Sequence, residues 1–440
     1  MEPTHEGERP SAPSPDHHAP RLVEAELDAA LATHPAVSLE GPPEAGKTAL
    51  AAARGGSVVR LDDPAQRELA HADPTLLVTG TKPIVLAQWH HHPTARDVVR
   101  LAARHDPRPG QFVLTGARPR DAHVTDDIAS LPVRPLALAE RRPDTQKVSL
   151  AALLTGAREA PQAESPLALA DYAAEVTRSG LPRVRALTEH ADRTQALEAL
   201  VARILDQELP ALGDRARKPA QLRRWLRAVA AASATGTARE QVLAAAATTG
   251  PGATRVRPTR ATIQPHREAL EALGVVDPLP AWQPDPAPLP RLARSPTHHL
   301  ADPALAAHLL EAEATDLLRG RRAEPPAPTD RALLGLLVTS LVVQSVRVCA
   351  QAIGARAAHV RQHSGRRAVP LLVEGANGQV VALTVALGQV ADEDAVNELR
   401  WFGARLGDRV ADLVMVTTGP VAYRRRSDGV AVVPAAALGP

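Results

Sequence analysis

The feature that most constrains the fold is a glycine-rich loop close to the N-terminus. Residues 41–48 read Gly-Pro-Pro-Glu-Ala-Gly-Lys-Thr and match the phosphate-binding pattern GxxxxGK[ST]. An apolar run at 37–39 precedes the loop, and a helical pattern begins at Thr48. Such a loop requires an entering strand and a departing helix, because backbone N–H groups must converge on one anion. The loop therefore predicts an α/β domain with a parallel sheet.

Each part of the loop has an expected chemical role. Its glycines let the backbone curl so that N–H groups point at phosphate oxygens. Lys47 is expected to reach the β- and γ-phosphates of ATP, and the Thr48 hydroxyl to hold Mg²⁺. The alternative is a glycine-rich turn with an exposed lysine. The predicted nucleotide-binding residues are Gly41, Glu44, Ala45, Gly46, Lys47 and Thr48.

Composition narrows the class of protein without assigning a function. The chain has 440 residues, which predicts about three domains. Its 51 basic and 49 acidic side chains leave a net charge of +2, too small by itself to indicate a nucleic-acid partner. The single cysteine, Cys349, excludes an intramolecular disulfide and a cysteine-based zinc site. Because we find no apolar run of ~18 residues and no signal peptide, we expect a cytoplasmic protein without a membrane partner.

The pattern of apolar and polar residues divides the chain into six regions. We expect a disordered tail (1–20), a P-loop nucleotide-binding domain (21–145), a helical region (146–215), a winged-helix-like region (216–318), a Pro-rich linker (319–331) and a second α/β domain (332–440). The first domain should contain strands near 37–39, 57–61, 83–89, 111–116 and 131–138.

Helical spacing dominates the middle of the chain. One predicted helix face carries Leu197, Leu200, Val201, Ile204, Leu205 and Leu209, and a second carries Leu222, Trp225, Leu226 and Val229. A third helix is expected to start at a Thr259 or Thr262 cap, to end at Gly274 and to lead into a strand at Val275 and Val276. The order resembles a winged helix-turn-helix. In the second α/β domain we expect helices at 333–352 and 393–405 and strands at 368–374, 379–385, 413–417 and 430–433.

A phosphate loop that hydrolyses ATP needs carboxylates at the end of a second strand, one for Mg²⁺ and one for the attacking water. The expected strand runs into Ala87-Gln88-Trp89-His90, and no carboxylate occurs between Lys82 and Asp97. ATP binding can survive this loss, whereas hydrolysis should be weak or absent. Asp62 or Asp63 is the alternative source of a Mg²⁺ ligand.

Several segments together resemble one protein family. They are 40–50, Leu61-Asp62-Asp63-Pro64, 111–117, Arg134-Pro135-Leu136, Trp282, Asp302-Pro303-Ala304-Leu305 and 429–434. In this order they resemble bacterial AAA-type P-loop ATPases with a C-terminal domain of unknown function that has a restriction-endonuclease-like fold. The resemblance covers most of residues 22–440. It places Thr115 at the family's sensor position. In the family the second strand ends in Asp-Glu-Trp-Gln, and this chain keeps only the tryptophan, Trp89.

The resemblance also implies that region 332–440 is nuclease-like but lacks its active site. The positions of the family's metal-binding Glu, Asp and Glu-x-Lys are Val338, Pro370, Thr384 and Ala386, and no lysine follows Lys218. Pro370 within a strand predicts that this strand lies at a sheet edge or is disturbed, because proline cannot donate to the ladder. We therefore expect no nuclease activity.

Three weaker signals carry alternatives. His90, His91 and His92 either bind a metal or form a solvated turn. Arg255, Arg257 and Arg260 are possible nucleic-acid contacts; the alternative is that they form an ordinary surface cluster in an Arg-rich chain. The same two alternatives apply to Arg424, Arg425 and Arg426.

These observations lead to one functional prediction and two alternatives. We expect an ATP- and Mg²⁺-binding protein of AAA-type descent that acts as a switch and hydrolyses ATP slowly or not at all. The alternatives are a DNA- or protein-interaction module that does not use nucleotide, and a decaying paralogue. DNA is a possible partner, and the sequence identifies no protein partner.

Overall fold

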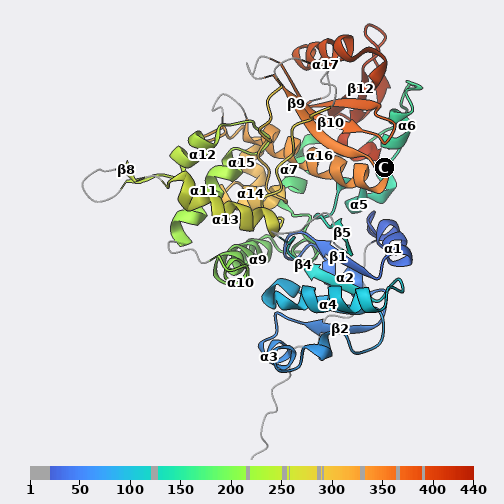
Figure 1. Ribbon diagram of the computed structural model, residues 1–440. Coiled ribbons are helices and arrows are strands. Elements are labelled where there is room, and N and C mark those ends of the chain that lie inside the picture. The colour runs from blue at the N-terminus through green and yellow to red at the C-terminus, as the bar shows by residue number, and fades with distance from the viewer. Residues whose placement is uncertain are drawn as a thin grey trace, which may run out of the picture.

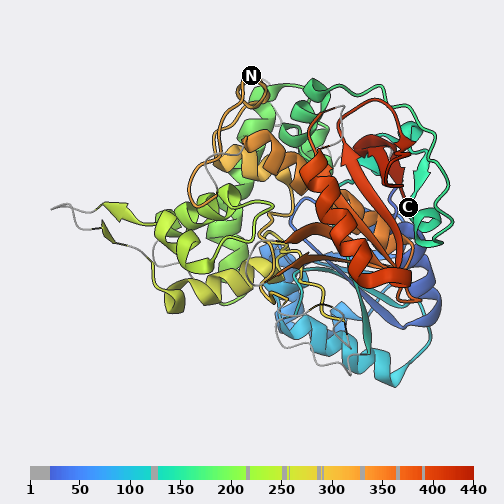
Figure 2. The same cartoon turned by 90° about the horizontal axis from the view of Figure 1, so that it is seen from above.

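The computed structural model describes residues 20–119, 127–214, 219–249, 255–256, 258–284, 289, 292–327, 332–362, 367–388 and 392–440. The predicted tail, except for Pro20, and Arg257 lie outside the described residues. The fold is mixed α/β, with one parallel sheet and one separate mixed sheet (Figures 1 and 2).

The parallel sheet contains the strand that enters the glycine-rich loop. Its strand order is β2-β3-β4-β1-β5. The strands are β1 (Ala36–Glu40), β2 (Ser57–Arg60), β3 (Ile84–Ala87), β4 (Phe112–Gly116) and β5 (Ile128–Pro132). The first four confirm the predicted strands. The prediction of a strand at 131–138 is wrong in its bounds, because Pro135 cannot donate to a ladder and Leu138 already begins the helix α5.

Helices cover both faces of this sheet. Successive side chains along a strand point to opposite faces, and β1, β3 and β4 are buried at every position, so both faces need cover. Val37 and Leu39 share a core with Leu27 and Leu50, which lie on α1 (Glu24–Thr33) and α2 (Lys47–Ala52). The opposite face packs against α3 (Pro64–Ala72) and α4 (Thr94–His105). The glycine-rich loop thus leaves the middle of a sheet that is buried on both sides.

The middle of the chain is helical, as predicted. Its helices are α5 (Leu138–Arg141), α6 (Leu150–Leu154), α7 (Leu169–Thr177), α8 (Pro182–Arg185), α9 (His190–Arg203), α10 (Leu209–Ala211), α11 (Pro219–Ala231), α12 (Arg239–Ala245), α13 (Arg260–Ala272), α14 (Pro303–Leu309) and α15 (Ala314–Leu318). A π-helical turn, η5 (Ile204–Glu208), joins α9 to α10. Every residue of the two predicted helix faces is buried.

The predicted third helix is α13. Thr259 is its N-cap, because its hydroxyl accepts a hydrogen bond from the Thr262 amide at 3.2 Å. The strand predicted after Gly274 is reduced to an isolated bridge between Val276 and Leu300. A short hairpin of β7 (Thr248–Thr249) and β8 (Arg255–Val256) precedes α13 and extends away from the body (Figures 1 and 2). The order of elements therefore differs from three helices followed by a strand.

The second sheet is mixed and lies near the C-terminus. Its strand order is β13-β14-β12-β11-β10-β9. The strands are β9 (Arg356–Arg361), β10 (Ala368–Glu374), β11 (Val380–Ala386), β12 (Val410–Thr417), β13 (Tyr423–Arg424) and β14 (Ala431–Pro434). Its two faces pack against α16 (Leu333–Ala352) and α17 (Glu393–Leu406). Both helices and the four predicted strands are present, whereas β9 and β13 were not predicted.

We expected no apolar segment long enough to span a membrane, but helix α16 is one by length and composition. By length and composition it is the one helix among the described residues that is apolar enough to cross a membrane. However, 83% of its apolar window is buried inside the protein. Its side chains contact the second sheet and the helical middle, which is the environment of a core helix.

Pro370 lies in an interior strand, since β10 pairs with both β9 and β11, so the predicted edge position is wrong. The predicted disturbance is present, because the β10–β9 register shifts between Val369 and Leu372. This is where proline withholds a donor.

One apolar cluster connects most of the predicted regions, while separate clusters fill the other face of each sheet. A single apolar cluster runs from Val23 to Leu438. Strand β15 (Leu438–Gly439) pairs with β6 (Val148–Ser149), so the C-terminus lies beside α5 and α6 (Figure 1). In the predicted linker, Ala323 and Ala327 pack against Leu336 of α16.

Candidate functional site

The backbone of the glycine-rich loop is held closely against neighbouring segments. A Cβ atom at Gly41 would lie 2.0 Å from the carbonyl oxygen of Val133, so no other residue fits there. Gly46 has a φ of 89° and Glu44 a φ of 65°, both in the left-handed region. Glycine adopts this conformation without strain, whereas a glutamate does so at a cost of about 1–2 kcal/mol. The loop therefore holds a curled conformation.

Lys47 is folded into this loop. Its Nζ donates hydrogen bonds to the carbonyl oxygens of Gly41 and Pro42, both at 2.7 Å. Burial lowers the pKa of Lys47 to about 8, although the carboxylates of Glu208 and Glu44 act in the opposite direction. The alternative of a turn with an exposed lysine is wrong, since Lys47 is 5% exposed.

Thr48 and Thr115 lie together. Their hydroxyl oxygens are 3.0 Å apart, and the backbone N–H of Gln88 donates to the Thr115 hydroxyl at 3.4 Å. Thr115 is the penultimate residue of β4, which lies between β1 and β3, so the loop and the ends of β3 and β4 meet at one edge of the sheet. Hydroxyl oxygens are ligands that suit Mg²⁺. The structure thus brings the predicted Mg²⁺ ligand to the predicted sensor residue.

Neither alternative carboxylate lies at Thr48. Asp63 accepts a hydrogen bond from the Ala65 amide as the N-cap of α3, and Asp62 forms an ion pair with Arg60 at 3.5 Å. Both follow β2, which is separated from β4 by β3. Neighbouring strands are about 4.8 Å apart, so these carboxylates lie too far from Thr48 to share a metal ion with it.

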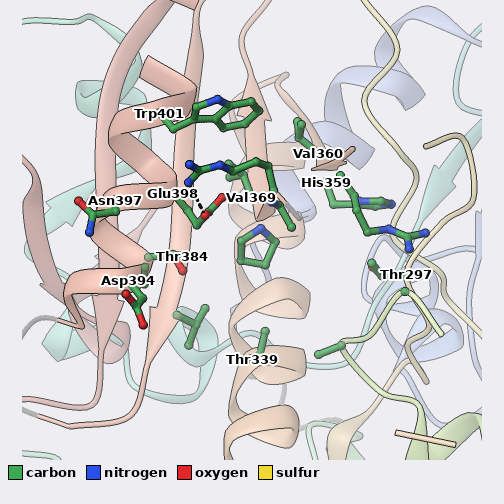
Figure 3. Close-up of a pocket in the computed structure, with 18 of the residues that line it drawn as sticks. Thr297, Thr339, His359, Val360, Val369, Thr384, Asp394, Asn397, Glu398 and Trp401 are labelled. Carbon is green, nitrogen blue, oxygen red and sulfur yellow. Dashed lines mark hydrogen bonds and ion pairs between the residues drawn. The ribbon is translucent and has the colours of Figure 1, made fainter. Parts of the chain in front are cut away.

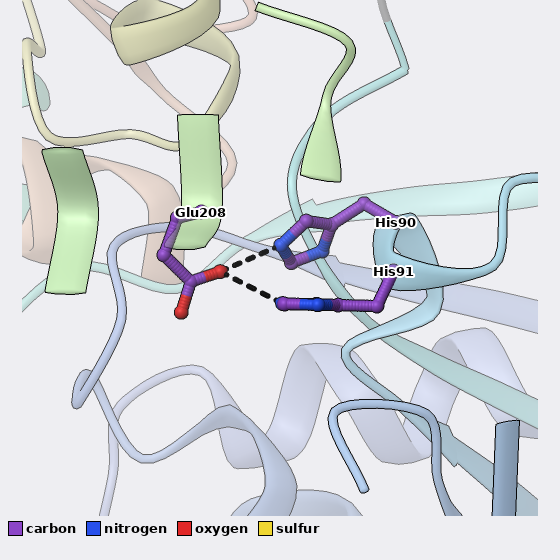
Figure 4. A group of neighbouring side chains, drawn as sticks. All are labelled: His90, His91 and Glu208. Carbon is purple, nitrogen blue, oxygen red and sulfur yellow. Dashed lines mark hydrogen bonds and ion pairs between the residues drawn. The ribbon is translucent and has the colours of Figure 1, made fainter. Parts of the chain in front are cut away.

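A buried carboxylate from the helical middle nevertheless reaches the turn that follows β3. Glu208, on the π-helical turn η5, accepts from Nε2 of His90 at 2.9 Å and lies 3.2 Å from Nε2 of His91 (Figure 4). Both contacts are to the same oxygen, Oε2. His90 is 2% exposed, so the expectation of a solvated turn is wrong. His92 lies apart from this cluster, with its Nε2 3.1 Å from the hydroxyl of Thr94.

The cluster of His90, His91 and Glu208 has ligand types found at zinc sites, with ligand atoms within 4.8 Å of one another. The hydrogen bonds argue against a metal there. The N–H of Ala117 donates to Nδ1 of His90 at 3.3 Å, so the proton of this neutral ring is on Nε2, which faces Glu208. A ligating histidine instead donates through its second nitrogen. The nearby cations Lys47 and Arg203 further disfavour a metal ion.

Arg203, the last residue of α9, links Glu208 to the loop. Oε1 of Glu208 accepts from Nε of Arg203 at 2.7 Å, and Nη1 of Arg203 donates to Oε1 of Glu44 at 2.7 Å. Although burial alone would raise its pKa, hydrogen bonds from His90 and His91 hold the pKa of the Glu208 carboxyl well below its usual range. Sequence reasoning missed Glu208 and Arg203 because charged residues at the end of an amphipathic helix carry no local signal of such contacts.

The second sheet forms one wall of an open cavity of about 1830 Å³ (Figure 3). Pro370 and Thr384 line it, in two of the four positions where the resembled family has its metal-binding residues. Glu398 in this cavity accepts from Arg367 at 2.7 Å, which occupies its carboxylate. Val338 and Ala386 are buried. Asp392, Asp394, Asp408 and Asp428 also line this cavity, so the absence of nuclease activity stays a prediction.

The arginine clusters have different outcomes. Arg260 is exposed at the start of α13, whereas Arg257 and the side chain of Arg255 lie outside what the structure describes. Arg424 pairs with Asp412 at 2.7 Å, and Arg425 pairs with Glu393 at 2.8 Å. DNA binding at 255–260 stays a prediction, and the charges of Arg424 and Arg425 are already paired.

Comparison with known proteins adds one match. The family model of a domain of unknown function (DUF8612) matches residues 169–316, about a third of the chain. No curated protein and no solved structure matches. Both Arg203 and Glu208 fall inside the matched segment, so the part of the chain that contacts the loop is similar to this family.

Proposed function

We propose that this protein binds ATP with Mg²⁺ at the loop of residues 41–48 and hydrolyses it slowly. The observation that carries the proposal is the buried Lys47, whose Nζ is held inside a curled loop next to the paired hydroxyls of Thr48 and Thr115. We further propose descent from AAA-type ATPases, which the order of the quoted segments supports.

The topology of the parallel sheet supports a ligand at this place. After β1 the chain crosses to β2 at the far edge and returns through β3 to β4, beside β1. In open α/β sheets, ligands bind outside the carboxyl ends of strands at such a switch in direction. The loop, Thr115 and the end of β3 all lie at that edge.

The end of β3 explains why hydrolysis should be slow. Ala87 and Gln88 have no carboxylate with which to order Mg²⁺ or to polarise water. The loop would therefore retain ATP, and its contacts with Arg203 and with the end of α13 would transmit occupancy to the helical middle. This arrangement suits a switch.

Thermal unfolding of the wild type with and without MgATP tests the proposal. At a hundred times Kd, ATP contributes ~2.7 kcal/mol, which raises the melting temperature by about 3 °C when a chain of this length unfolds as one unit. Lys47→Ala should abolish the shift. Lys147→Ala is the matched control, because Lys147 is exposed and lies outside the loop. A wild type that MgATP does not stabilise would overturn the proposal.

A further inference from the structure

The end of β3 has no carboxylate of its own but is supplied with one from another part of the chain. Glu208 reaches it from η5, and its side chain is 1% exposed. A π-helical turn inside an α-helix is rare and is frequently found at functional sites. Here the turn ends at Glu208, directly before α10. This carboxylate lies beside His90 and His91, the third and fourth residues after the strand from which the acids are missing.

The cluster of His90, His91 and Glu208 adjoins the residues assigned to Mg²⁺ and phosphate. A Cβ atom at Gly116 would lie 2.6 Å from Nδ1 of His90, so glycine is what allows the ring to approach β4. Gly116 directly follows Thr115, whose hydroxyl is 3.0 Å from that of Thr48. The charge of Glu208 also acts on the buried Lys47.

The hydrogen bonds set the protonation of both imidazoles. An ionised carboxylate oxygen only accepts, so Nε2 of His90 and Nε2 of His91 each carry a proton toward Oε2 of Glu208. In the neutral ring of His91 this leaves a lone pair on Nδ1. That nitrogen makes no hydrogen bond to any described residue. His91 has 13% of its side chain exposed, against 2% for His90, so His91 is the ring of the two that solvent contacts more.

We propose that His91, oriented by Glu208, is the general base for slow ATP hydrolysis at this loop. The inference rests on the proposed function. The water oxygen attacks the γ-phosphorus while Nδ1 of His91 takes the water proton. The bond from the γ-phosphorus to the bridging oxygen breaks, ADP leaves with those electrons, and His91 returns the proton to solvent. Glu208 is a positioning residue, because it acts by holding the tautomer of His91.

Steady-state phosphate release from the full chain, measured beside ATP binding, tests the proposal. His91→Ala should lower kcat about 100-fold without weakening ATP binding, since general bases contribute about 10²- to 10⁴-fold. Glu208→Gln should lower kcat with Kd unchanged and should alter the pH profile of kcat, because an amide can donate to Nε2 of His91 and favour the wrong tautomer. His92→Ala is the matched control, as His92 contacts Thr94 instead, and its kcat should equal that of the wild type.

Two outcomes would overturn this inference. One is a wild-type rate no higher than that of Lys47→Ala, and the other is a His91→Ala rate equal to that of the wild type. In either case, retained stabilisation by MgATP would leave the proposed function standing, whereas its absence would remove both. If Glu208→Gln unfolds, His91→Gln is a second test. This variant keeps a polar side chain but has no basic nitrogen, so its kcat should fall as that of His91→Ala does.

Discussion

The end of helix α13 presses against the first residues of the phosphate loop, and a single methyl group at Gly274 should disturb both. A Cβ atom there would lie 2.9 Å from Cα of Gly41 and 3.0 Å from the nitrogen of Pro42. These are backbone atoms, so no side-chain rotation relieves the clash. Gly274 also has a φ of 71°, which an alanine adopts only with strain. Gly274→Ala therefore combines backbone strain with displacement of the loop.

Gly213 separates these two effects. Its φ is 76°, and an added Cβ meets nothing within 4 Å. We expect Gly213→Ala to lose about 1 kcal/mol of unfolding free energy from the left-handed conformation alone. Gly274→Ala should lose about 3 kcal/mol, because overpacking adds about 1–3 kcal/mol. The loop must recover its geometry to enclose phosphate, so about 1.4 kcal/mol of this strain should appear as an approximately tenfold weaker Kd for ATP.

Urea unfolding and nucleotide titration of the two variants check this reasoning. Gly213→Ala should bind ATP as the wild type does. Equal losses of unfolding free energy in both variants, together with unchanged ATP affinity in Gly274→Ala, would refute the idea that α13 bears on the loop.

Two further predictions concern buried charges. Burial lowers the pKa of Lys47 to about 8, and only the charged form attracts phosphate, so ATP affinity should fall about tenfold per pH unit above pH 8. Lys47→Arg should remove this fall, because arginine stays charged. Kd titrations from pH 7 to 10 that give the same pH dependence for the wild type and Lys47→Arg would contradict this prediction. Glu175 is 2% exposed and pairs with Arg141, Arg142 and Arg185, so Glu175→Ala should cost about 3–5 kcal/mol in urea unfolding. The exposed Glu198, paired with Arg223, is the control; its loss should cost at most about 1 kcal/mol, and similar costs would argue against a special role of burial.

Local patterns predicted most of the elements. The loop at 41–48, four strands of the parallel sheet and helix α16 follow from motif, apolar runs and helical period, which depend on neighbours in the chain. The cap of α13 was predicted at Thr259 or Thr262 for the same reason, because a cap bonds to an amide three residues away, and the structure selects Thr259. The shift of β5 and the strands β9 and β13 were missed, since pairing partners rather than local preference set strand bounds.

Only the tertiary structure decided what surrounds the loop. Glu208 is 118 residues from His90, and Arg203 is 159 residues from Glu44, yet both pairs are in hydrogen-bond contact. The sequence by itself determined that residues 41–48 match the phosphate-loop pattern and that the carboxylates expected after β3 are missing, because both are properties of a short segment. It contained no signal that a carboxylate from η5 arrives at the same place, since packing of the helical middle against the parallel sheet sets that contact.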